Sequence, residues 1–176
     1  LDGPRGYNDL VFDDEGAAIG SDGITLIRAT SAVDWEVYAV GVGMIYKMGY
    51  LPSGDIVATK ADRTIVKIAS NGISSLLVGD FDGYGLAIGS DGMVYAGTNY
   101  TTDRPEIIRV DPSTGEFTQL IDAHGFPPRG LEFSHDYSRL YFGNTNNGNI
   151  YGVDLDENLD PVGEPEVIVT VPVGWH

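Results

Sequence analysis

Polar side chains recur at a regular spacing along this sequence. Asn8, Tyr46 and Tyr84 follow one another at intervals of 38 residues, and Arg129 comes 45 residues after Tyr84. Asp9 stands directly beside the first of them. Two tyrosines, an arginine and an Asn-Asp pair can hold a polar organic molecule or an anion by hydrogen bonds and stacking. These five residues are the candidate ligand-binding set, provided that the fold brings them together.

Each of these residues begins a similar stretch of chain. The segments align without gaps, with apolar residues first and then a polar turn that ends in glycine, at residues 8–16, 46–54 and 84–92. A fourth copy begins at Arg129. Short β-rich runs recur inside the units at residues 26–29, 65–68, 107–110 and 150–153. Turn signals such as Asn71-Gly72, and then a last strand such as residues 116–120, complete each unit.

This repeat predicts an all-β fold, a β-propeller built of four-stranded antiparallel blades. Four short strands in about 40 residues are typical of one blade. No long segment has the helical period of about 3.6 residues. The predicted blades are residues 8–45, 46–83, 84–128 and 129–176, in a single propeller domain or a portion of one. Matching residues of the blades should then line one mouth of a central channel. A second interpretation stays open, in which they only fill this channel and contact one another.

Composition excludes several kinds of partner. The chain has no cysteine, so it forms neither disulfides nor cysteine-ligated zinc sites. Its net charge of −16 would repel phosphate groups, so nucleic acid and anionic membranes are excluded as partners. No apolar stretch approaches the roughly 20 residues that cross a bilayer. A small molecule or a protein is the partner that remains.

One group of predicted strands carries a family resemblance. Residues 128–136 read Pro-Arg-Gly-Leu-Glu-Phe-Ser-His-Asp, and residues 139–145 and 148–156 follow as the next two strands. Together they resemble the gluconolactonase and regucalcin-like propellers, in which proline, asparagine, glycine, leucine, an apolar residue, serine, proline and aspartate succeed one another. The resemblance is clearest over residues 84–170. It implies a six-bladed propeller of which this chain is a four-blade portion, completed by further blades, a companion chain or a second copy.

The resemblance also implies a divalent cation on the propeller axis, Ca²⁺ or Zn²⁺, and metal-dependent lactone hydrolysis. Its ligands lie just before the first strands of several blades. One expected asparagine is replaced by Arg129, which has no lone pair to donate to a metal. A second is expected at or beside Gly83 and Tyr84, which offer no carboxylate or amide side chain. The remaining metal candidates are Asn8, Asp9 and Asp82.

Other acidic and basic residues are better explained by structure. Residues 80–83 and 154–160 have acidic spacings that suggest calcium loops, but Leu159 and Pro165 replace residues that a calcium loop needs, and polar turns are favoured. Arg28, Lys67 and Arg109 recur in the third strands and are expected to pair with acids of the adjoining blade. No G-x-S-x-G elbow and no helix-spaced histidine pair is present.

Three functions follow from these observations. The first is a non-catalytic propeller that binds a ligand or partner at its axial face, because Tyr84 and Arg129 stand where metal ligands are expected. The second is a divalent-metal-dependent hydrolase of lactones or similar esters. The third is a structural part of a larger extracellular scaffold.

Overall fold

The computed structural model describes residues 9–31, 33–98, 106–123, 127–143 and 148–171. Over these residues the regular structure consists of strands and contains no helix. None of them forms a helix long and apolar enough to cross a membrane. The chain divides into two compact units, Leu1–Phe81 and Asp82–His176, which are described one at a time.

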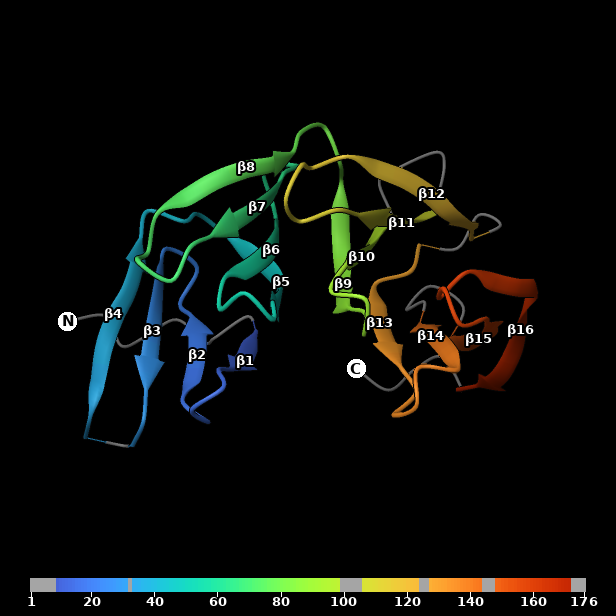
Figure 1. Ribbon diagram of the computed structural model, residues 1–176, viewed down its shortest axis with the longest axis horizontal. Helices are drawn as coiled ribbons and strands as arrows, with labels where there is room; N and C mark the ends of the chain where they lie inside the picture. The colour runs from blue at the N-terminus through green and yellow to red at the C-terminus, as the bar shows by residue number, and fades with distance from the viewer. Residues whose placement is uncertain (1–8, 32, 99–105, 124–126, 144–147, 172–176) are drawn as a thin grey trace. The chain divides into compact units, whose positions relative to one another are not determined.

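The first unit contains two antiparallel sheets, and each strand pairs only with its neighbours in sequence (Figure 1). One sheet is formed by β1 (Leu10–Phe12), β2 (Ala18–Ser21), β3 (Thr25–Ala29) and β4 (Trp35–Val40). The other is formed by β5 (Ile45–Tyr50), β6 (Ile56–Lys60), β7 (Ile65–Ile68) and β8 (Ser74–Val78). A shared core holds them together, and it includes Ile19, Leu26, Met48, Ile56 and Ile68.

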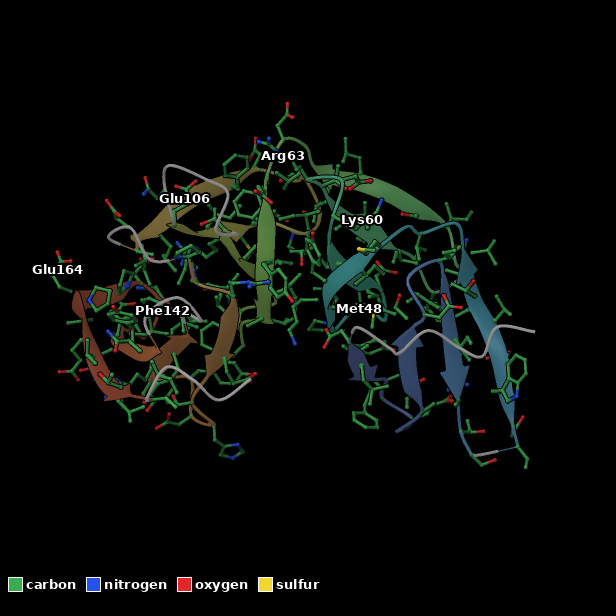
Figure 2. All side chains as sticks on the ribbon, turned by 180° about the vertical axis from the view of Figure 1, so that it is seen from behind. Met48, Lys60, Arg63, Glu106, Phe142 and Glu164 are labelled. Carbon is green, nitrogen blue, oxygen red and sulfur yellow. The ribbon has the colours of Figure 1, made fainter. Side chains whose placement is uncertain are left out.

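The second unit repeats this arrangement. Its sheets are formed by β9 (Gly83–Ile88), β10 (Val94–Thr98), β11 (Glu106–Val110) and β12 (Phe117–Asp122), and by β13 (Gly130–Phe133), β14 (Arg139–Gly143), β15 (Asn149–Leu155) and β16 (Pro161–Thr170). Tyr95, Ile107, Leu140 and Phe142 are among the residues of its core. Figure 2 labels Met48 on β5, which belongs to the core of the first unit, and Phe142 on β14, which belongs to the core of the second unit. Four antiparallel four-stranded sheets of consecutive strands confirm the predicted propeller blades.

Two glycines allow β13 to approach the sheet β9–β12 closely. A Cβ atom built on Gly97 would lie 2.2 Å from the carbonyl oxygen of Pro128 and 2.8 Å from Cδ1 of Leu131. One built on Gly85 would lie 2.7 Å and 2.9 Å from the same two atoms. Real Cβ atoms do not make such short contacts, so only glycine fits at both positions. We call Gly85 and Gly97 the glycine socket of this sheet.

Carboxylates close the turns between the first two strands of the blades. In the last blade, Asp136 accepts hydrogen bonds from the hydroxyl groups of Ser134 and Ser138, both at 2.7 Å, and from the backbone N–H of Ser138 at 3.1 Å. In the first and third blades, Asp13 and Asp91 accept from a backbone N–H two residues ahead. Such side-chain turns fix hairpin geometry locally.

The Asp136 turn predicts a pH dependence. Hydrogen bonds from Ser138 and then Ser134 favour the charged carboxylate and lower the pKa of Asp136 to about 2. Because this pKa lies below that of the unfolded chain, the stabilisation is complete above the unfolded pKa and is lost as the pH falls from about 4 to about 2. In Asp136→Asn this part of the acid-induced loss of stability should disappear, as measured by urea unfolding between these two pH values. Equal acid sensitivity in Asp136→Asn and the parent chain would contradict it.

Candidate ligand site at the start of the first strands

The starts of two first strands carry β-bulges that set the direction of the candidate side chains. In the pairing of β9 with β10 the register shifts beside Tyr84, between Ala96 and Thr98. In the pairing of β5 with β6 it shifts at Tyr46, between Ile45 and Lys47. A bulge places two residues opposite one and turns a side chain away from the regular alternation. The two tyrosines thus occupy the same irregular place in their blades.

Arg129 lies against Tyr84 in the second unit. The guanidinium carbon of Arg129 is 4.1 Å from the centroid of the Tyr84 ring, within the range of a cation–π contact. The backbone N–H of Arg129 donates to the carbonyl of Gly143 at 3.0 Å, which fixes the start of β13 against β14. Two of the predicted site residues, 45 positions apart in sequence, are therefore in direct contact.

This pair borders an open depression of about 420 Å³. In its floor Gly130 pairs with Gly143, and among the described residues no atom lies within 4 Å of a Cβ built on either glycine. Its remaining lining residues are Gly148, Asn149, Ile150 and Val171. The depression combines one guanidinium, one phenol and one amide with a glycine backbone and the apolar side chains of Ile150 and Val171. Such a mixture suits a small polar or anionic molecule.

Asp9 and Lys47 form the corresponding contact in the first unit. Lys47 Nζ lies 3.2 Å from Asp9 Oδ1, and the backbone N–H of Met48 donates to Asp9 Oδ2 at 2.6 Å. The contact joins the beginnings of two successive blades, since β1 and β5 are neighbours. Both oxygens of Asp9 are therefore already engaged within the first unit.

The predicted set is partly brought together. Tyr84 contacts Arg129 in the second unit, and Asp9 contacts Lys47, the neighbour of Tyr46, in the first unit. Asn8 lies outside the described residues. Sequence reasoning missed Lys47 as the partner of Asp9 and the glycine floor beneath Arg129. The recurrence of glycine at positions 85 and 130 was the available signal for that floor.

The described residues at these positions do not fit a divalent cation. Arg129 brings a positive charge to a place where the family resemblance implies an asparagine ligand. The carboxylate of Asp9 forms an ion pair with Lys47. Over the described part of the chain no three His, Asp or Glu side chains gather in a way that could hold a metal ion. Asp82 lies directly before β9, two residues ahead of Tyr84, and contributes to no such group among the described residues.

The acidic run at residues 154–160 is a hairpin turn, as predicted. The N–H of Asp156 donates to the carbonyl of Asp160 at 2.9 Å, and that of Leu159 donates to the carbonyl of Asp156 at 3.0 Å. Oδ1 of Asp156 accepts from the N–H of Asn158 at 2.8 Å. Leu159 has a φ of 59°, a backbone conformation that normally favours glycine, and its side chain is buried in the core of the second unit.

The prediction for the basic residues of the third strands is confirmed for Arg109 and wrong for Arg28. Arg109 Nη1 lies 2.9 Å from Oδ1 of Asp160, which belongs to the adjoining blade. Arg28 instead binds Asp13 and Glu15 at 2.6 Å each, within its own sheet. Desolvation acts to raise the pKa of Asp13, but the hydrogen bond from Arg28 and those from backbone amides outweigh it and lower that pKa. Both carboxylates lie in the turn between β1 and β2, so Arg28 forms its ion pairs within its own blade.

Four antiparallel four-stranded sheets, each formed by consecutive strands, are blades of the β-propeller type. The sequence matches the SMP-30/Gluconolactonase/LRE-like region over residues 41–174, and the chain belongs to this family. No curated protein matches the sequence significantly.

Solved structures of distant proteins share this fold. An auxiliary nutrient binding protein from Bacteroides thetaiotaomicron aligns with a TM-score of 0.78 at 14% identity, over 98% of this chain and 44% of its own. A gluconolactonase from Xanthomonas campestris aligns with a TM-score of 0.75 at 16% identity, over 89% of this chain and 60% of its own. A chain of the nidogen/laminin complex aligns with a TM-score of 0.78 at 15% identity, over 94% of this chain and 65% of its own. This chain thus spans between 44% and 65% of their lengths, and identities this low establish the fold alone.

Proposed function

We propose that this chain is a non-catalytic β-propeller module that binds a small anionic or polar organic molecule beside Tyr84 and Arg129. The observation that carries the proposal is the guanidinium of Arg129 stacked on Tyr84 at the edge of the open depression. A guanidinium presents a planar fork of N–H donors that matches a carboxylate, and its stacking on a ring limits its movement before a ligand arrives. A positive charge here is notable in a chain of net charge −16.

The neighbouring structures support both the binding and the ligand class. One is named a nutrient binding protein and another a gluconolactonase, whose name indicates chemistry on a sugar lactone and its hydroxy acid. A hydroxycarboxylate would meet Arg129 with its carboxylate and Tyr84 or Asn149 with its hydroxyl groups. The glycine floor leaves room for its carbon chain, because no side chain rises from Gly130 or Gly143.

Titration calorimetry with hydroxycarboxylates, D-gluconate first, tests this proposal. Arg129→Gln should weaken binding by about 10- to 100-fold, because hydrogen bonds to a charged group contribute about 1.5–3 kcal/mol. Arg63→Gln removes an equal charge from an exposed turn in the first unit (Figure 2) and should leave the affinity unchanged. Absence of binding across the series, or equal binding by Arg129→Gln and the parent chain, would overturn the proposal.

The family match favours a second candidate, a metal-dependent hydrolase of lactones or similar esters. The same preparations decide between the two. Hydrolysis of glucono-δ-lactone that appears only with added Ca²⁺ or Zn²⁺, and metal retained by the purified protein, would establish the hydrolase and refute the non-catalytic module. The charged pair Asp9–Lys47 and the cation Arg129 at the axial positions argue for the first candidate.

A further inference from the structure

In the second unit, large side chains fill the space between the two blades. Tyr95 on β10 pairs with Arg109 on β11, and Leu159 belongs to the turn between β15 and β16. A Cβ built on Gly89, directly after β9, would lie 2.7 Å from Cε2 of Tyr95 and 3.1 Å from Cδ1 of Leu159. These two side chains are buried in the core of the unit, and Arg109 binds Asp160 of the adjoining blade beside them.

The first unit has a smaller residue at the place of the tyrosine. Ile19 on β2 pairs with Arg28 on β3, as Tyr95 pairs with Arg109 in the second unit. Ile19 is fully buried, but it lacks the phenol ring that extends beneath the turn of the third blade. The same place of the repeat therefore holds less side-chain volume in the first unit.

The first unit also lacks a side chain at the place of Leu159. In both turns between a third and a fourth strand, one N–H donates to the carbonyl three residues back, that of Gly72 at 2.8 Å and that of Leu159 at 3.0 Å. Their φ angles are 81° and 59°. A Cβ on Gly72 would collide with the carbonyl oxygen of Tyr38, because this turn lies against β4 (Figure 1). No side chain can therefore enter the interblade space from Gly72.

A cleft of about 430 Å³ lies between the two blades of the first unit. Ile19 lines its buried part, and two partly buried tyrosines line it from the two blades, Tyr38 on β4 and Tyr50 on β5. A cleft of this volume with apolar and aromatic walls has the size of a small-molecule site. We call it the interblade cleft, and its other lining residues are Asp13, Asp14, Glu15, Arg28, Glu36, Gly54 and Ser70.

Negative charge exceeds positive charge around the interblade cleft. Its lining has four carboxylates and one guanidinium, so three negative charges are not balanced within it. Arg28 lies 2.6 Å from both Asp13 and Glu15, but 3.5 Å from the largely exposed Glu36. The close ion pairs of Arg28 therefore engage Asp13 and Glu15. Glu36 and Asp14 are the carboxylates that can meet the positive charge of a ligand.

The two tyrosines respond to the same negative field. Burial raises the pKa of Tyr50, and the carboxylates of Asp14 and Asp13 raise this pKa further. Burial also raises the pKa of Tyr38, and Tyr50, Asp55 and Asp13 act in the same direction. Both phenols are therefore neutral at physiological pH. A neutral phenol ring attracts an organic cation through its π system.

We propose that the interblade cleft of the first unit binds a small organic ammonium compound. The ammonium group would meet Glu36 and Asp14, and its apolar part would lie against Ile19 and the two tyrosine rings. Over the described residues no three His, Asp or Glu side chains gather to hold a bare metal ion, and such an ion has no use for aromatic walls. The site lies within the first unit and does not rest on the ligand proposed beside Arg129.

NMR titration of the isotope-labelled chain with 2-phenylethylammonium tests the proposal. Backbone amide shifts should concentrate at the residues that line the interblade cleft, with a Kd of about 1 mM or lower. The compound 2-phenylethanol lacks the charge and ethylammonium lacks the ring, so each should bind at least about tenfold more weakly. Salt at about 0.15 M screens diffuse attraction of cations to the acidic surface.

Ser70→Lys places an ammonium group of the chain itself at the edge of the cleft. It should weaken binding by about tenfold or more, because the new charge competes for the same carboxylates. Ser75→Lys is the matched control. Ser74 lies in one cross-strand row with Tyr50, so the exposed Ser75 belongs to the opposite face of the sheet β5–β8, and its substitution should leave the affinity unchanged.

Glu36→Gln removes one carboxylate at nearly constant size and should weaken binding by about three- to tenfold. Glu157→Gln makes the same change in an exposed turn of the second unit and should bind like the parent chain. The spectrum of each variant also shows that it is folded. Amide shifts spread over the whole acidic surface, equal affinity for the three compounds, or parent-like binding by both Ser70→Lys and Glu36→Gln would each overturn the proposal.

Discussion

Gly97→Val is expected to lower the free energy of unfolding of the second unit by about 3 kcal/mol, which is a large effect for a single substitution. The added Cβ would lie 2.2 Å from a backbone oxygen of Pro128, and the backbone cannot move aside as a flexible side chain can. The start of β13 would have to leave the sheet β9–β12, taking Leu131 out of the core. Urea unfolding followed by far-UV circular dichroism measures the change.

Gly143→Val is the matched control for this substitution. It makes the same change at the equivalent place of the last blade, where no atom of the residues that the structure describes lies within 4 Å of the new Cβ. Valine also suits a strand better than glycine does, so stability should be unchanged or slightly higher. Equal destabilisation by the two substitutions would show that the close approach of Pro128 does not determine stability.

Ile107→Ala is expected to cost about 2–5 kcal/mol, because it removes three carbon atoms from a fully buried site and leaves a cavity. Ile150→Ala makes the same change at the equivalent but partly exposed position and should cost about 1 kcal/mol or less. Both are measured by urea unfolding followed by far-UV circular dichroism. A cost for Ile150→Ala as large as that for Ile107→Ala would show that the difference in burial between the two positions does not determine stability.

The repeat made the fold predictable from sequence to a large extent. Residues 8–16, 46–54 and 84–92 share a phase, and β1, β5 and β9 begin within two residues of those starts. Turn chemistry also acts locally, so the hairpin at residues 154–160 was correctly distinguished from a calcium loop. Signals of this kind depend only on nearby residues, and a sequence shows nearby residues directly.

The contacts of the site were harder to predict, because they depend on how far each side chain reaches. Arg28 and Arg109 occupy the same place in their strands, yet one binds Asp13 in its own sheet and the other binds Asp160 in the next blade. The difference comes from which acid the neighbouring turn offers, and no repeat alignment contains that information. The contact of Arg129 with Tyr84 similarly depends on a bulge in β9 that alternation alone does not reveal.

The pairing of every strand with its immediate neighbours in sequence has a consequence for how the polypeptide reaches its native state. Each sheet can close its hairpins over short loops, so little chain entropy is lost before the first contacts form. During synthesis the sheet β1–β4 is complete in sequence before residue 45 is translated, and later blades can then add to a surface that already exists. The blades would thus fold one after another during synthesis, in the order in which they are translated.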